Sequence, residues 1–162
     1  MRHHQVISGA VLQYKEEGQF GDRFEFRVSY FEFRIMSTED KITSFTDLDA
    51  WQKAHDLATT VYEDTDDFPN EETFGLVSQM RRCAVSIASN IAEGFSWRSD
   101  KDKIRFYNMA RGSVTELQSQ LLIARDVGYL AEDVFTDLSD QAVTAHKIIN
   151  GLIKSTRERY SS

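Results

Sequence analysis

Cysteine and proline are almost absent from this chain of 162 residues, which has one of each. Because Cys83 stands alone, no disulfide can form within the chain, and this fits a reducing compartment. The single Pro69 disfavours helical geometry in the residue before it, so a helix must end by Phe68. The glycines are isolated and form no phosphate-binding loop.

Long hydrophobic runs are absent as well. No segment reaches the roughly 18 apolar residues that a membrane-spanning helix requires. The N-terminus has no continuous apolar stretch followed by a small-residue cleavage site, so it does not resemble a secretory signal. We therefore expect a cytoplasmic protein without a membrane partner.

Positive charge is the scarcer sign, because 19 Lys and Arg face 26 Asp and Glu for a net charge of −7. Residues 1–35 contain five of each sign, so the whole imbalance lies in residues 36–162. An acidic domain does not indicate nucleic-acid binding by its net charge. Such binding requires a local basic patch.

The first 35 residues differ in character from the rest, with seven of the 19 aromatic residues. Phe24 to Tyr30 alternates apolar and polar residues, which is typical of a strand. Two interpretations are open: a β-ribbon that serves as an interaction arm, or a leader translated upstream of a true start at Met36. We assign residues 1–44 to an N-terminal extension and residues 45–162 to the main domain.

Helical periodicity begins after Phe45. Thr46 and Asp49 have capping-box spacing, and a first helix follows. The apolar residues of this helix recur at three- and four-residue steps: Leu48, Trp51, Ala54, Ala58, Val61 and Tyr62.

A second helix is predicted from an Asn70 cap to Gly94, with Glu71 and Glu72 at its positive end. Its apolar face comprises Phe74, Val77, Ala84, Ile87, Ala88 and Ile91.

A third helix is predicted from a Ser99 cap to Gly128, and a fourth from an Asp133 cap. The face of the third carries Ile104, Tyr107, Ala110, Val114, Leu117, Leu121 and Ala124. The face of the fourth carries Val134, Leu138, Ala142, Ala145, Ile149, Leu152 and Thr156. Four such helices with short connections predict an all-α, antiparallel, up-down-up-down four-helix bundle.

A series of motifs resembles one bacterial protein family, first met in intervening sequences of 23S ribosomal RNA genes. The motifs run in order over 45–54, 68–69, 79–87, 90–94, 98–99, 105–106, 110–113 and 116–117. The resemblance covers about Phe45 to Ile153 and leaves residues 1–35 outside it. The accessory variability proteins of diversity-generating retroelements have a similar fold.

The resemblance implies a four-helix protomer that assembles into a ring-like homopentamer without known catalysis. For the retroelement relatives it implies contact with RNA and with a reverse transcriptase through basic surface. This chain departs from a strongly basic pattern, with acidic pairs at Glu63-Asp64, Asp66-Asp67 and Glu132-Asp133.

Basic and aromatic residues gather around the junction of the second and third predicted helices. The candidate nucleic-acid-binding residues are Arg81, Arg82, Trp97, Arg98, Lys101, Arg105, Tyr107 and Arg111, with Lys103 and Phe106 between them. Cations that contact phosphates and rings that stack on bases are the combination used for single-stranded RNA. The alternative is a solvated face or a set of salt bridges between subunits.

A polar ladder is predicted on the same two helices. Its members recur at three- and four-residue steps: Ser86, Asn90 and Glu93, then Ser113, Glu116 and Gln120. It is either a ligand site inside the bundle or a hydrogen-bond network that fixes the helix register.

Catalytic and metal-binding patterns are not found. A metal site in a bundle core uses Glu-x-x-His pairs, but Gln52 precedes His55 at that spacing and Val143 precedes His146. Cys83 has the position of an apolar filler rather than a nucleophile. We therefore expect no enzyme, cofactor, metal or small-molecule substrate.

Consecutive apolar residues are more numerous than a single core stripe can use. They occur at 121–123, 148–149 and 152–153. They indicate either a wide core face or contact with another protomer. The hypothesis is a homo-oligomer that binds RNA or an RNA-bound protein, and the competing hypothesis is a protein scaffold without nucleic-acid binding.

Overall fold

The computed structural model describes residues 4–7, 10–13 and 42–160, and the chain divides into two compact units, Met1–Asp40 and Lys41–Ser162. In the first unit, β1 (His4–Ile7) pairs antiparallel with β2 (Ala10–Gln13). This strand pair is not among the predicted elements. The predicted strand at 24–30 and the proposed start at Met36 lie outside the described residues.

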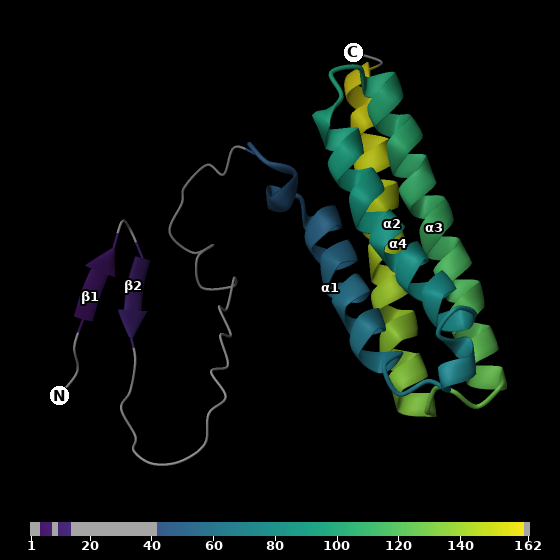
Figure 1. Ribbon diagram of the computed structural model, residues 1–162. Coiled ribbons are helices and arrows are strands. Elements are labelled where there is room, and N and C mark those ends of the chain that lie inside the picture. The colour runs from purple at the N-terminus through teal and green to yellow at the C-terminus, as the bar shows by residue number, and fades with distance from the viewer. Residues whose placement is uncertain (1–3, 8–9, 14–41, 161–162) are drawn as a thin grey trace. The chain divides into compact units, whose positions relative to one another are not determined.

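The second unit is an all-α bundle in which consecutive helices run in opposite directions (Figure 1). Its long helices are α1 (Asp49–Asp64), α2 (Leu76–Ser96), α3 (Asp100–Asp126) and α4 (Glu132–Tyr160). Two short 3-10 helices precede α1 and α2, namely η2 (Phe45–Asp47) and η3 (Asn70–Glu72). The predicted up-down-up-down four-helix bundle is confirmed.

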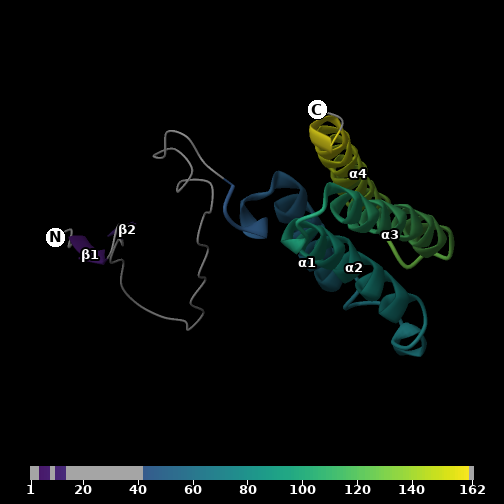
Figure 2. The ribbon, with the colours of Figure 1, turned by 90° about the horizontal axis from the view of Figure 1, so that it is seen from above.

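Each long helix packs against two others, so the order around the bundle is α1, α2, α3, α4. The view from above follows this order (Figure 2). The arrangement brings the C-terminal end of α4 to the same end of the bundle as the turn between α2 and α3 (Figure 1). Residues far apart in the sequence therefore share this end.

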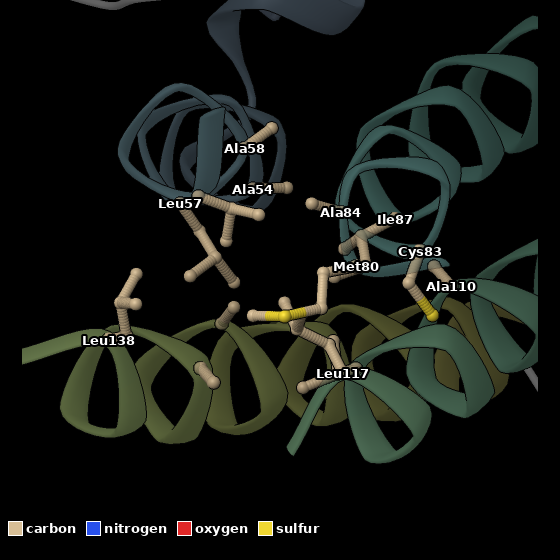
Figure 3. Packing of buried hydrophobic residues seen from close by; sticks show 14 of the residues in the cluster. Ala54, Leu57, Ala58, Met80, Cys83, Ala84, Ile87, Ala110, Leu117 and Leu138 are labelled. Atoms are coloured by element: carbon tan, nitrogen blue, oxygen red, sulfur yellow. The ribbon is translucent and has the colours of Figure 1, made fainter. Parts of the chain in front are cut away.

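The core lies where the apolar stripes of the helices meet. Leu57 of α1, Met80 of α2, Leu117 of α3 and Leu138 of α4 are fully buried and point towards one another (Figure 3). Burying side chains of this size contributes about 1.5–3 kcal/mol each. The stripe of α4 is wide, because Ile148 and Leu152 pack partly buried beside Ile149. The apolar pairs of α4 therefore belong largely to the core.

The start of α1 differs from the prediction. The capping box is formed by Ser44 and Asp47 around η2, and not by Thr46 and Asp49. Asp47 Oδ2 accepts from the Ser44 backbone N–H at 2.8 Å, and Ser44 Oγ accepts from that of Thr46 at 3.3 Å. The backbone N–H of Thr43 also donates to Asp47 Oδ2, at 2.9 Å. The hydrogen bonds from the backbone of Thr43 and of Ser44 stabilise the carboxylate and so lower the pKa of Asp47. Ser44 and Asp47 have the same three-residue spacing as Thr46 and Asp49, and the two pairs overlap in the sequence. The capping box forms at the earlier pair.

The start of α2 is also corrected. Asn70 begins the short η3 and does not cap the long helix, which starts six residues later. The Glu72 carboxylate accepts from the Leu76 backbone N–H at 2.9 Å and so acts as a side-chain cap. Phe74, predicted to lie in the core, falls in the turn and is 95% exposed. Tyr62 on α1 was also predicted for the core and is 46% exposed.

Gly94 was predicted to end α2, but it lies within the helix, which continues to Ser96. A Cβ at this position would lie 2.6 Å from Tyr107 Cε1 and 3.1 Å from Phe106 Cβ. Glycine is therefore required by the close approach of α3 and not by a left-handed turn. Gly128 has the left-handed geometry predicted, with φ of 82°, where α3 has ended.

The caps of the last two helices agree only in part with the sequence. Ser99 Oγ accepts from the Asp102 backbone N–H at 3.4 Å, which confirms the predicted cap of α3. Asp133 lies inside the first turn of α4, because Phe135 N–H already bonds Ala131 O at 2.9 Å. Its carboxylate faces the positive end of the helix rather than capping it.

Candidate nucleic-acid interface

The turn between α2 and α3 presents the predicted basic and aromatic residues at one end of the bundle. Trp97 is the extended residue that ends α2, and Ser99 caps α3 two residues later. Arg98 therefore lies in the tight connection, while Lys101 and Arg105 lie in the first two turns of α3. This short connection keeps the four side chains at the same end of the molecule.

An aromatic platform supports this cluster. The Trp97 ring lies nearly parallel to the buried Phe106 ring, with centroids 5.9 Å apart and planes 14° apart. Trp97 is 45% exposed, and the Arg105 guanidinium lies 5.4 Å from the centre of the Phe106 ring. The platform therefore combines an exposed indole with a cation held beside the stack.

The cations at this end have few partners. Arg98, Lys101 and Arg105 are exposed and have no salt bridge among the residues from 42 to 159. Lys103 is instead tied to the fold, because its ammonium donates to Phe95 O at 2.8 Å and its burial lowers its pKa. Asp100 and Asp102, in the first turn, reduce the net positive charge here.

The end of α4 adds positive charge that the sequence analysis missed. The charge of Arg159 acts on both Lys103 and Tyr107, which places it beside the start of α3. Over residues 97–105 and 154–159 the chain has seven Lys or Arg and three Asp or Glu. The antiparallel topology alone could have indicated this, since the fourth helix of such a bundle ends where the third begins.

Four of the predicted binding residues do not belong to this cluster. Tyr107 is only 2% exposed, so the prediction that it stacks on a base is wrong. Arg81 is hydrogen-bonded to the end of α1. Its Nε donates to Oγ1 of the buried Thr65 at 2.9 Å, and a terminal guanidinium nitrogen donates to Tyr62 O at 3.1 Å. Arg111 is half-buried and bonds Asn150 of α4. Arg82 is exposed, but it bonds Gln79 in the first turns of α2, far along the helix from Trp97.

The polar ladder lies along the contact of α2 with α3. Ser86 Oγ and Ser113 Oγ are 3.0 Å apart, and Asn90 Nδ2 donates to Ser86 Oγ at 3.0 Å. Further along, Gln120 Nε2 donates to Glu116 Oε1 at 3.3 Å. Glu93 is exposed and joins neither set. The ladder thus forms two separate groups of hydrogen bonds between or along the helices.

Cys83 lies against this ladder and is buried. Its thiol donates to Ser113 O at 3.3 Å. Burial, and then the neighbouring Glu116 carboxylate, raise the pKa of the thiol to about 12. The thiol therefore stays protonated at neutral pH, and a protonated thiol is a poor nucleophile and metal ligand.

The two histidines of the bundle have separate structural contacts. The His55 ring stacks on Trp51 with centroids 5.0 Å apart, and His146 Nδ1 lies 3.3 Å from Asn150 Nδ2. Among the residues that the structure describes, no three His, Cys, Asp or Glu side chains gather in a way that could hold a metal ion. None of the described helices is both long and apolar enough to cross a membrane.

Comparison with known proteins places this geometry in a family. A solved structure from Bacteroides thetaiotaomicron, of a protein with unknown function from the S23 ribosomal protein family, has 20% sequence identity and a TM-score of 0.59. The similarity covers 65% of this chain and 95% of that one, and it shows a shared fold. No curated protein matches the chain. Residues 46–151, most of the bundle, match the family model of the 23S rRNA-intervening sequence protein, and the chain therefore belongs to that family.

Proposed function

We propose that this protein is a non-enzymatic, self-assembling cytoplasmic bundle that binds single-stranded RNA through the end where α2, α3 and α4 meet. The observation that carries the proposal is the exposed Trp97 ring, stacked on Phe106, at the end of the bundle that also carries the exposed Arg98, Lys101 and Arg105. Cations supply phosphate contacts, and an aromatic face accepts a base of any identity. A homopentamer is the assembly that the family resemblance implies.

Single-stranded RNA fits this end better than a duplex. An unstacked base can lie on the outer face of Trp97, whereas the bases of a helix are already stacked on one another. The acidic balance of the remaining surface restricts phosphate contacts to this end, since the whole chain has a net charge of −7. The bound partner is then RNA itself or an RNA that carries a protein such as a reverse transcriptase.

The proposal is tested by the binding of labelled single-stranded and hairpin RNA to the full-length chain over a series of salt concentrations. If Arg98, Lys101 and Arg105 each neutralise one phosphate, log K falls against log salt with a slope of about −2. Arg98→Glu should reduce this slope by about 0.7 or more. Trp97→Ala should weaken binding by about 1–3 kcal/mol without changing the slope.

Lys53→Glu on α1 is the matched control, because Lys53 is exposed and already pairs with Asp56 at 3.4 Å. It changes the net charge as Arg98→Glu does but should leave RNA affinity nearly unchanged. If both reversals weaken binding equally, the protein responds to net charge and the site is wrongly placed. If RNA does not bind even at low salt, the competing hypothesis of a protein scaffold is favoured.

A further inference from the structure

One face of α3 is apolar although it points away from the core. Met109, Ile123 and Val127 are 47%, 50% and 54% exposed, and their spacing with Gly112 and Glu116 places all five on one side of the helix. We call these five residues the α3 stripe. Met109 lies towards one end of the stripe, and Ile123 and Val127 lie towards the other, with Gly112 and Glu116 between them. Large apolar side chains that remain in water on one side of a helix are typical of a contact surface.

Gly112 flattens the middle of this stripe. A Cβ at Gly112 would meet no atom of the described residues within 4 Å, so nothing in that part of the chain requires glycine there. Glycine inside a helix lowers stability relative to alanine, and this loss has no compensation within the fold. The absence of a side chain does allow a second backbone to approach closely.

The edge of the stripe has a buried acceptor without a partner and, beside it, a carboxylate without a cation. Gln120 is 9% exposed, and its Oε1 is the buried side-chain atom without a hydrogen-bond partner in the described part of the chain. The neighbouring Glu116 is exposed and makes no salt bridge among residues 42–159. The Glu116 carboxylate accepts from Gln120 Nε2 at 3.3 Å but faces no cation of its own chain in the described part. A buried acceptor beside such a carboxylate favours a partner that brings hydrogen-bond donors and positive charge.

The chain has a complementary surface on α4. Thr144, Lys147, Gly151 and Lys154 recur at three- and four-residue steps on the exposed side of this helix, and we call them the α4 stripe. Lys147 has no salt bridge in the described residues, and Gly151, like Gly112, has open space where a Cβ would lie. The α4 stripe therefore offers donors and its own flat position.

The two stripes lie at the same height in the bundle. Arg111 bonds Asn150 at 3.2 Å, which sets the level of α3 against that of antiparallel α4. Glu116 is five residues beyond Arg111, ~7.5 Å along the axis, and Lys147 is three residues before Asn150, ~4.5 Å in the same direction. Copies with parallel axes would thus bring Glu116 within ~3 Å of the height of Lys147.

We propose that the α3 stripe of one copy docks on the α4 stripe of the next, with Lys147 facing Glu116 and a donor of the partner meeting Gln120 Oε1. This inference rests on the self-assembly proposed above and names its interface. Because α3 and α4 are neighbouring corners of the bundle, their outer faces point roughly at right angles. Such unlike faces form a heterologous contact, which gives a closed ring when the rotation between successive copies closes and an open filament when it does not. In a ring of copies with parallel axes, every RNA-binding end lies on one rim.

The test is the mass of the full-length chain in solution over a range of concentrations, measured by light scattering and native mass spectrometry. Glu116→Lys and Lys147→Glu should each weaken association at least tenfold by placing like charges together. The double variant should recover most of the association, because it restores the pair with its signs exchanged. Asp67→Lys, at an exposed site on neither stripe, is the control for the change in net charge.

Gly112→Arg separates assembly from folding. In a single protomer the new side chain enters open space, so the variant should fold with the helicity of the wild-type chain, while assembly should be lost. The interface is overturned if the wild-type chain stays monomeric, if the single reversals assemble normally, or if the double variant folds without recovering association. If Glu116→Lys is monomeric and still binds RNA, the interface has been lost without affecting the RNA-binding end. Failure of the interface and failure of RNA binding are therefore distinguishable.

Discussion

At the scale of single residues, glycines at two helical positions have opposite physical roles. Gly94 faces α3 so closely that an added Cβ would overlap the Tyr107 ring. Gly112 faces open space. The sequence shows both only as isolated glycines in apolar helices, and it cannot separate them because the difference depends on the neighbouring helix.

Alanine substitutions measure this difference. We expect Gly94→Ala to lower the free energy of unfolding by about 1–3 kcal/mol, since α2 and α3 must move apart or Tyr107 must leave its position. Gly112→Ala should raise it by about 0.5–1 kcal/mol in the monomeric protein, through improved helix propensity. Urea denaturation of both variants checks these signs. Equal effects at the two positions would contradict the close contact at Gly94.

At the scale of elements, the N-terminal ends of the helices were the least predictable parts. Several hydroxyl and carboxylate residues near each boundary have suitable spacing, and the chosen cap depends on where the preceding turn leaves the backbone. Ser99 follows a tight two-residue connection and is the residue that caps α3. Asn70 is displaced by a 3-10 turn, and Glu72 caps α2 in its place.

The Ser99 cap has a measurable contribution. Ser99→Ala should lower the free energy of unfolding by about 0.5–2 kcal/mol, towards the lower end because the hydrogen bond to Asp102 N–H is 3.4 Å long. Ser89→Ala is the matched control, since Ser89 is exposed in the middle of α2, where alanine is the better helix former. Thermal melting of the two variants should give shifts of opposite sign.

At the scale of the whole molecule, charge is distributed unequally between the two ends of the bundle. The end opposite the proposed RNA-binding cluster carries eleven Asp and Glu over residues 62–81 and 125–140, with Arg81 and Arg125 as its cations. Asp64 is one of these acidic residues. Burial, followed by the charges of Asp137 and Glu63, raises its pKa above the ordinary value of 3.8.

Asp64→Asn should therefore stabilise the protein at neutral pH. Because the pKa of Asp64 is raised in the folded state, Asp64 contributes most favourably to the free energy of unfolding while its carboxyl group is protonated. This contribution is lost as the pH rises through the folded-state pKa. The gain from Asp64→Asn should be at most about 1 kcal/mol at pH 7, because the carboxylate is partly exposed, and it should vanish as the pH falls to about 4. Denaturation at several pH values checks this, and exposed Asp67→Asn is the control.

The sequence by itself determined the helical bundle and the family. Apolar residues at three- and four-residue steps fix which face of each helix is buried, and the short connections fix the antiparallel order. It also indicated Trp97, Arg98, Lys101 and Arg105, because their positions around one turn keep them together whatever the packing.

Only the tertiary structure decided which candidates remain accessible. Tyr107 and Trp97 are both aromatic residues beside basic ones, but the approach of α2 at Gly94 buries the first and leaves the second in solvent. The same packing bonds Arg81 to Thr65 and brings the end of α4 to the end of the bundle that carries Trp97 and Arg98. These outcomes depend on contacts between helices, and a periodic pattern within one helix contains no information about its neighbour.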